Sequence, residues 1–258
     1  MTFDDDLNAC AALVERGDPD RFLATMAAPV AARRVLFPLY ALNVEVARAP
    51  WVTQEPIIAE MRLQWWRDAL AEIAQGGPVR RHEIATPLSR VLSPELAGEM
   101  DEYIAVRRWD LYKDPFDSAE HFDRYIDRSS GCLVKVAAQT LGAARSETLR
   151  DFGYASGVAN LLRAAPELVR LGRAPLLDGT SDGISALAAS ALDRLARARA
   201  HRHSVSADAR PALLSGWQAQ TVLTQALRDP TRVGDGRLGT SEARRRISLM
   251  WQAATGRW

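Results

Sequence analysis

The stretch that decides the fold is DFGYASGVANLLRAAPELVRLGRAPLLD, which runs from Asp151 to Asp178. Small residues recur within it at helical spacing, at Gly153, Gly157 and Asn160. A glycine inside a helix costs about 1 kcal/mol relative to alanine. Two glycines one turn apart therefore predict that something lies close to this helix, either a neighbouring helix or a ligand in a cavity between helices. Pro166 lacks a backbone N–H, so we expect it to bend or end the helix.

Length and charge limit the classes of protein. The chain has 258 residues and a formal net charge of +1. It is long enough to bury a substantial core, and we expect a single domain over residues 1–258. The balanced charge argues against nucleic acid as a partner. Arginine far outnumbers lysine and alanine is abundant, which is typical of a GC-rich bacterial genome.

The sequence also indicates a compartment. Cys10 and Cys132 form no CxxC pair, so we expect reduced thiols in a cytoplasmic protein. The acidic N-terminus, MTFDDDLNAC, has no apolar run of the kind found in a secretory signal. No apolar segment approaches the ~20 residues that a membrane span needs. We therefore expect no transmembrane segment, and peripheral contact with the inner membrane stays open.

Apolar residues recur with helical rather than strand periodicity, so we expect an all-α fold of about ten to twelve helices. The clearest amphipathic helix is Gln54–Ala74, where a stripe widened by Ile58 and Leu70 is expected to face the core; the stripe consists of Ile57, Met61, Trp65, Ala69 and Ile73. Further helices are expected at Ala31–Val46, kinked or restarted at Pro38, and at Ser118–Ser129, Gly131–Leu141, Pro211–Leu227 and Ser241–Ala254, with a polar loop at Thr231–Gly239.

Asp123 and Asp127 lie one turn apart on the same face of the expected helix Ser118–Ser129. Such a pair can hold a divalent ion together with water and phosphate oxygens. A solvated charged face is the favoured interpretation, and the metal site is the alternative.

The stretch from Asp151 to Asp178 resembles the second signature of the squalene/phytoene synthase family. That signature is a helix with small residues, then Asn-x-x-Arg-Asp, three residues, Asp, and a Gly-Arg turn. The matching positions are Asn160, Arg163, Gly172 and Arg173. Ala164 and Leu168 stand where the family has its two aspartates.

The segment ARRVLFPLYALNVEVARAP, from Ala32 to Pro50, resembles the first signature of the same family, with matches at Arg33, Leu39, Tyr40 and Ala41. The family's Asp-Asp-x-x-Asp cluster should fall at Ala47, Arg48 and Trp51, none of which is acidic. Glu45 is the nearest carboxylate. A family Arg-Leu-x-Trp-Trp segment is matched by MRLQWWRDAL, which contains Arg62 and Trp66.

The longer segment LNVEVARAPWVTQEPIIAEMRLQWWRDALAEI resembles the branch of the family that lacks the aspartate-rich motifs. This branch includes a mitochondrial complex I assembly factor with a squalene/phytoene synthase-like domain. The matching positions are Asn43, Val44, Glu45, Met61, Arg62, Gln64, Trp65 and Trp66. The resemblance implies a non-catalytic relative that acts in the biogenesis of NADH:quinone oxidoreductase.

The resemblance also implies a fold and a site. The fold is a single-domain isoprenoid-synthase-like helical bundle around a central cavity. The expected cavity lining comes from the helix after Asp151 and from the helices Ala31–Val46 and Ile57–Ala74. The ligand-binding candidates are Arg33, Tyr40, Asn43, Glu45, Arg62, Trp66, Asn160, Arg163 and Arg173.

Synthases of this family ionise an allylic diphosphate, and Mg²⁺ held by carboxylates stabilises the pyrophosphate that leaves. Because both clusters have lost their acids here, we expect no cofactor, and Mg²⁺ only if the protein is a synthase after all. The first hypothesis is a pseudoenzyme with a respiratory-complex assembly partner or an isoprenoid or other lipid ligand. The alternative is an atypical head-to-head prenyltransferase acting on farnesyl or geranylgeranyl diphosphate. A passive isoprenoid-binding module would show an apolar cavity with a basic mouth.

Overall fold

The computed structural model describes residues 3–53 and 55–258, so Met1, Thr2 and Gln54, the expected first residue of the helix to Ala74, lie outside the described residues. The α-helices are α1 (Phe3–Gly17), α2 (Pro19–Ala27), α3 (Val30–Arg48), α4 (Pro56–Ala74), α5 (Ala85–Val91), α6 (Pro94–Arg107), α7 (Ala119–Ile126), α8 (Cys132–Leu141), α9 (Ser146–Arg170), α10 (Ser181–Ala200), α11 (Ala219–Arg228), α12 (Thr231–Gly234) and α13 (Glu242–Thr255). Short helical turns are η1 (Ala49–Trp51), η2 (Arg108–Leu111), η3 (Asp127–Gly131), η4 (Arg202–Ser204) and η5 (Arg210–Gly216).

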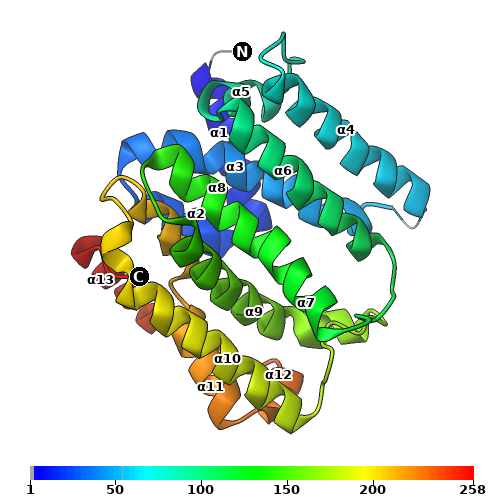
Figure 1. The fold of residues 1–258 in the computed structure, drawn as a ribbon, viewed down its shortest axis with the longest axis vertical. Coiled ribbons are helices and arrows are strands. Elements are labelled where there is room, and N and C mark those ends of the chain that lie inside the picture. Colours follow the sequence, from blue (N-terminus) through cyan, green and yellow to red (C-terminus); the bar gives the residue numbers. More distant parts are fainter. Residues whose placement is uncertain (1–2, 54) are drawn as a thin grey trace.

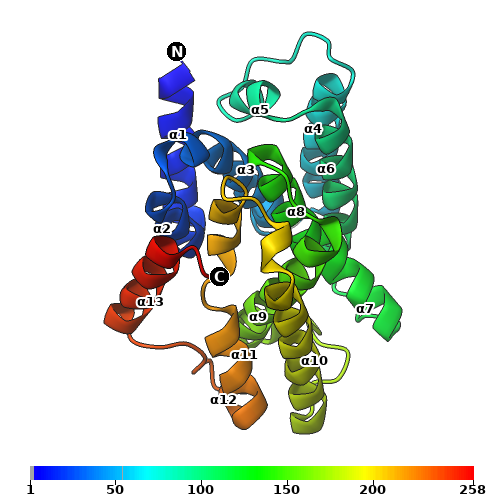
Figure 2. The same ribbon diagram turned by 60° about the vertical axis from the view of Figure 1, so that its left-hand side comes forward.

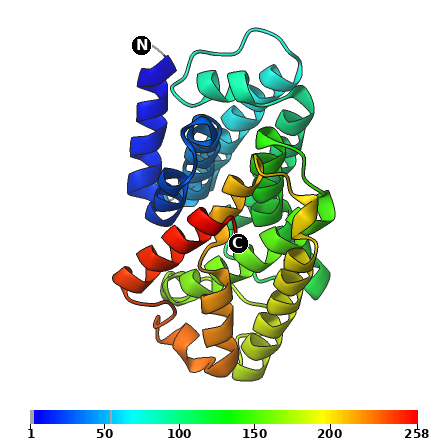
Figure 3. The same ribbon diagram turned by 90° about the vertical axis from the view of Figure 1, so that its left-hand side faces the viewer.

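The all-α expectation is confirmed. Within residues 3–53 and 55–258 the β-type pairing is limited to one isolated antiparallel bridge between Ala144 and Val205. Helices α4 and α6 pack side by side at one end of the molecule, and α10, α11 and α12 group at the other end (Figures 1 and 2). The last helix, α13, lies beside α2, so distant parts of the chain meet (Figure 3). No helix in the described part is long and apolar enough to cross a membrane.

Helix α9 is the central element of the bundle, as its sequence predicts. It packs against α8, α10, α11 and the turn η3. A Cβ on Gly153 would come within 2.6 Å of the Cα of Gly131, and a Cβ on Gly157 within 2.7 Å of the Cβ of Ser130. Gly153 therefore admits the backbone of η3, which is a neighbouring helical turn, and Gly157 admits the side chain of Ser130. Gly157 also lines a cavity, so the glycine pair serves both a helix contact and a cavity wall.

The two internal prolines do not interrupt their helices. Helix α3 continues through Pro38 and α9 continues through Pro166 to Arg170, so neither a restart nor an end occurs there. The end of α9 is set by Gly172, whose φ of 76° is in the left-handed region. The N–H of Gly172 donates to the carbonyl of Val169, and the next N–H reaches Leu168, which is the hydrogen-bond pattern of a Schellman motif.

The expected core stripe of α4 is wrong over its first two turns. The buried face consists of Ala59, Leu63, Trp66, Ala69, Leu70 and Ile73. Ile57, Ile58 and Met61 are exposed instead. The side of α4 that packs against α6 carries only part of the apolar pattern, and the N-terminal end of α4 lies at the edge of the molecule (Figure 1).

Two other expected boundaries differ from the structure. The expected helix Pro211–Leu227 is divided into η5 and α11. Gly216, at the end of η5, lies so close to Phe152 and Ser156 that a Cβ there would collide with both. The expected polar loop Thr231–Gly239 begins with the short helix α12. Helix α7 ends at Ile126 and passes into the π-helical turn η3.

Candidate functional site

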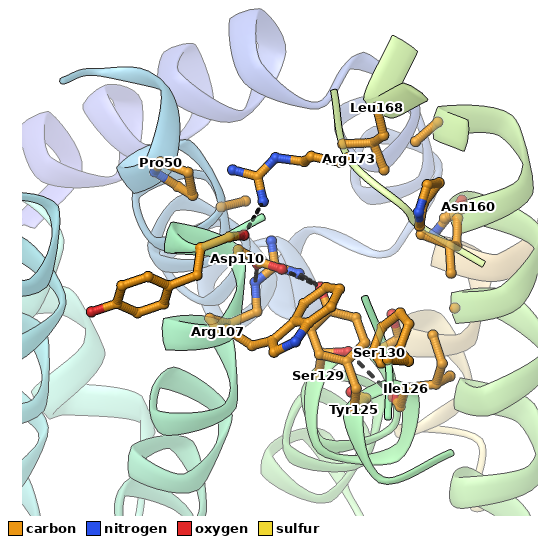
Figure 4. Close-up of a pocket in the computed structure, with 18 of the residues that line it drawn as sticks. Pro50, Arg107, Asp110, Tyr125, Ile126, Ser129, Ser130, Asn160, Leu168 and Arg173 are labelled. Atoms are coloured by element: carbon orange, nitrogen blue, oxygen red, sulfur yellow. Dashed lines mark hydrogen bonds and ion pairs between the residues drawn. The ribbon is translucent and has the colours of Figure 1, made fainter. Parts of the chain in front are cut away.

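Two adjoining cavities lie beside α9. The first, of about 290 Å³, is lined mainly by apolar side chains, and we call it the apolar cavity (Figure 4). The second, of about 630 Å³, is lined largely by charged and polar side chains, and we call it the polar cavity. Their linings share Ala47, Trp51, Arg107, Ser130 and Asn160. The two therefore form one continuous site with an apolar and a cationic part.

The apolar cavity brings together the positions of both family signatures. Ala47 and Trp51 line it from α3 and η1, and Ala164 and Leu168 line it from α9. These are four of the five positions at which the resemblance places metal-binding aspartates. Figure 4 shows the two walls, with Pro50 on one side and Leu168 on the other. Where a synthase would have facing carboxylates, this chain has apolar side chains.

The fifth position, Arg48, carries the opposite charge to an aspartate. It lines the polar cavity and forms an ion pair with Glu45, with 3.2 Å between Nη1 and Oε1. A cation here repels Mg²⁺ and attracts an anion.

A hydrogen-bonded triad forms another part of the apolar cavity wall. The Tyr125 hydroxyl donates to Asp110 at 2.7 Å, and Arg107 donates to the Tyr125 hydroxyl at 2.8 Å. The Nε of Arg107 lies 2.9 Å from Asp110. Burial raises the pKa of Tyr125, so its hydroxyl stays protonated at neutral pH. The triad holds α6, η2 and α7 together, and its only sequence signal is an arginine three residues before an aspartate at a helix end.

Cationic side chains lie at the edge of the apolar cavity. The guanidinium of Arg173 is 4.8 Å from the ring centroid of Trp51 and donates to the carbonyl of Tyr112 at 2.9 Å. Lys113 also lines the cavity and is exposed. Asp114 lines the cavity next to Lys113 and is also exposed, so this edge carries two cations and one carboxylate.

Asp20 of α2 is the centre of the polar cavity's wall. It accepts hydrogen bonds from Arg163 of α9 at 2.8 Å and from Gln218 at 2.7 Å, and it also pairs with Arg245 of α13. Two guanidiniums thus share one carboxylate, and Arg16, Arg21 and Arg48 line the same cavity. Asp20 has no local sequence signal, because its partners lie 143 to 225 residues away along the chain.

Four of the predicted ligand-binding residues line the cavities. Asn43 and Arg163 line the polar cavity, Arg173 lines the apolar cavity, and Asn160 lines both. The Oδ1 of Asn43 accepts from the Tyr103 hydroxyl at 2.8 Å. Asn160 is exposed and lies opposite Pro50 across the cavity (Figure 4).

The other five predicted residues do not line either cavity, and neither does α4, which corrects the expected lining by Ile57–Ala74. Arg33 donates to the carbonyls of Ala28 and Met26 and so caps the end of α2. The remaining four are placed in the core or in an ion pair: Tyr40 and Trp66 are buried, and Arg62 lies 3.1 Å from Glu45.

Asp123 and Asp127 face a guanidinium. Arg194 of α10 lies 3.5 Å from Asp123 and 3.6 Å from Asp127, and the Tyr154 hydroxyl donates to Asp123 at 2.5 Å. Burial raises the pKa of Asp127, which weakens it as a cation ligand. No group of three or more His, Cys, Asp or Glu side chains suited to a metal occurs within residues 3–53 and 55–258. The residues at the signature positions do not fit Mg²⁺.

Comparison with known proteins identifies the scaffold. A crystal structure of a dehydrosqualene synthase in complex with ligand superposes with a TM-score of 0.76 at 17% identity, covering 98% of this chain and 96% of that one. A squalene synthase from Alicyclobacillus acidocaldarius gives a TM-score of 0.71 at 16% identity over 89% of this chain and 95% of that one. At these identities the likeness shows the fold, and the expected isoprenoid-synthase-like bundle is confirmed.

The curated relatives that match this chain are named as complex I assembly factors, not as synthases. The chain is 28% identical over 166 residues to the Drosophila melanogaster "NADH dehydrogenase (ubiquinone) complex I, assembly factor 6 homolog", covering 61% of this chain and 50% of the relative. The corresponding Mus musculus assembly factor 6 is 24% identical over 161 residues, covering 61% and 48%. The chain thus spans about half the length of the curated relatives it matches. The profile of the family described as squalene/phytoene synthase matches residues 14–248, and the chain belongs to the squalene/phytoene synthase family.

Proposed function

We propose that this protein is a non-catalytic member of the family that acts in the biogenesis of respiratory complex I. The observation that carries the proposal is the apolar wall formed by Ala47, Trp51, Ala164 and Leu168 at four of the five signature positions. Ionisation of an allylic diphosphate separates charge, and Mg²⁺ held by carboxylates stabilises the leaving pyrophosphate in such synthases, whereas these positions carry no carboxylate. The relatives named as complex I assembly factors support the assembly role.

The first test is a turnover assay. The purified protein is incubated with farnesyl and with geranylgeranyl diphosphate, with and without Mg²⁺, and pyrophosphate release is followed. We expect no release above the protein-free reaction. Mg²⁺-dependent release that falls sharply in Asn160→Ala and Arg163→Ala would overturn the proposal and support the prenyltransferase alternative.

The assembly role needs a second test in the organism that carries the protein. Deletion of the gene is expected to lower the amount of assembled complex I on a native gel and to leave other respiratory complexes unchanged. Normal complex I in the deletion strain would contradict the role, whatever the turnover assay shows.

Lipid binding is a second candidate function, favoured by the cationic Arg173 and Lys113 at the edge of the apolar cavity. An isoprenoid chain in the cavity would place an anionic head near these side chains. We expect a farnesyl diphosphate complex by native mass spectrometry without Mg²⁺, and its loss in Leu168→Trp, which fills the cavity. An unchanged complex in that variant would place the ligand elsewhere.

A further inference from the structure

A group of large apolar side chains is exposed at one end of the molecule. We call it the α4 patch, and it consists of Trp51 (49% exposed), Val52 (46%), Ile57 (66%), Ile58 (43%) and Met61 (67%). Isolated exposed apolar residues are normal on protein surfaces, whereas a group on two elements that pack together, as η1 and α4 do, indicates an interaction site. These five come from η1, the residue after it and the first two turns of α4.

The patch has a sharp limit along α4. Gln64 and Asp68 follow on the same side of the helix as Ile57 and Met61, and they form a hydrogen bond of 2.8 Å with each other. Both are exposed. The apolar surface is therefore confined to the N-terminal end of α4, which lies at the edge of the bundle in Figure 1.

The patch is continuous with the mouth of the apolar cavity. Trp51 belongs to both, since it lines the cavity while half of its surface stays exposed. Tyr112 also lines the cavity, and its hydroxyl donates to Glu60 of α4 at 2.6 Å. Arg108 of η2 holds the same carboxylate at 3.0 Å. These contacts fix the end of α4 beside the opening.

We propose that the α4 patch docks on the surface of a lipid bilayer, so that the apolar cavity opens directly against the membrane. The side chains fit this occupant: Trp and Tyr favour the level of the lipid headgroups, and Ile and Met can enter the acyl region below. Lys113 and Arg173 line the cavity together with Trp51 and Tyr112, where cations can meet lipid phosphates. Asp114 lines it as well, so two cations outnumber one carboxylate there. An apolar chain can then pass between bilayer and cavity without crossing water.

A protein partner fits the same surface less well. A rigid partner that covered Trp51 would also close the cavity mouth, which would leave the cavity without an entrance on this side. A fluid bilayer covers the patch and keeps the cavity accessible. The docking does not depend on the assembly role or on the absence of catalysis, so it is tested separately.

Helix α13 provides a matched control surface. Ile247, Met250 and Trp251 are 68%, 70% and 61% exposed, which is close to the exposure of Ile57 and Met61. Neither cavity of the site reaches α13. If exposed apolar residues bound membranes without regard to place, the two surfaces would behave alike.

The experiment measures flotation of the full chain with vesicles of phosphatidylcholine and phosphatidylglycerol, with no prenyl diphosphate and no other protein present. We expect the wild type to bind, and Ile57→Ser/Met61→Ser to reduce the partition coefficient by at least about tenfold, since two inserted apolar side chains are lost. Ile247→Ser/Met250→Ser should bind like the wild type. Absence of wild-type binding, or equal loss in both double variants, would overturn the proposal.

The orientation on the membrane is tested by lipids that carry bromine in their acyl chains and quench nearby tryptophans. Trp51→Phe should remove most of the quenching, whereas Trp251→Phe on α13 should leave it. Quenching that survives Trp51→Phe and disappears in Trp251→Phe would assign docking to α13. Circular dichroism of each variant confirms that the fold is intact.

Discussion

The carboxylate of Asp20 connects side chains from several helices. It accepts hydrogen bonds from Arg163 and Gln218 and pairs with Arg245, so it joins α2 to α9, to the start of α11 and to α13. Asp20→Asn leaves two guanidiniums facing each other without a carboxylate, and we expect the free energy of unfolding to fall by about 1–3 kcal/mol. Urea denaturation measures this.

The matched control for Asp20 is Glu242→Gln. Glu242 pairs with Arg246 on the exposed surface of α13, where its side chain is 68% exposed. Surface pairs of this kind contribute little, so the change should stay within about 0.5 kcal/mol. Equal effects of the two substitutions would show that the partners of Asp20 are held in place by other contacts.

Asp127 gives a prediction that depends on pH. Burial raises its pKa above the ordinary 3.8, despite the opposing effect of Arg194, so the ionised carboxylate is disfavoured in the folded state. At pH 7 Asp127→Asn should therefore increase the free energy of unfolding. Below pH 3.8 the carboxyl is protonated in folded and unfolded chains alike, and the difference should disappear. A loss of stability at pH 7 that persists at low pH would contradict this origin.

At the scale of the element, α9 depends on its glycines. Gly153→Ala adds helix propensity, but its Cβ would lie 2.6 Å from Gly131 of η3, so we expect a net loss of about 1–3 kcal/mol from overpacking. Gly98→Ala in α6 is the control, because nothing lies within 4 Å of the added Cβ. It should gain about 0.5–1 kcal/mol. If thermal unfolding showed that both Gly153→Ala and Gly98→Ala increase stability, η3 would have moved to make room for the added Cβ.

The same element shows what sequence reasoning can and cannot reach. The helix, its central place and its close neighbour follow from periodicity and from the cost of glycine. Its end does not follow from Pro166, because the helix continues through that residue to Arg170 and the stop is set by Gly172. On α4 the periodic stripe predicts a core face along the whole helix, yet periodicity indicates only that one face is apolar. It does not report whether a neighbour covers that face.

At the scale of the whole molecule, contacts between distant segments bind the ends of the chain. Helix α13 packs against α2, and Trp258 packs against Phe152 of α9 with ring centroids 5.1 Å apart. We expect a single cooperative unfolding transition, with coincident curves from tryptophan fluorescence and far-ultraviolet circular dichroism. Separate midpoints for the two signals would show that part of the bundle unfolds independently.

The fold of the whole molecule was more predictable from sequence than the site. Family signatures and helical periodicity predict the bundle, because both depend on local spacing. The site combines side chains such as Asp20, Arg107 and Tyr125, whose partners come from other helices and leave no local pattern. Residues that match a signature, such as Tyr40 and Trp66, proved to be core residues. A family signature contains residues that maintain packing as well as residues that take part in chemistry, and the sequence alone does not distinguish the two kinds.

The apolar wall of the cavity has a consequence for single substitutions. A magnesium site needs several carboxylates at once, since one carboxylate holds the ion poorly. A lone aspartate regained at Ala164 or Leu168 would share its cavity with Arg107 and Arg173 and would gain a cationic neighbour before it gained a metal. A single acidic substitution here would therefore give an ion pair with an arginine and no metal site. Building a magnesium site at this wall would take several acidic substitutions made together.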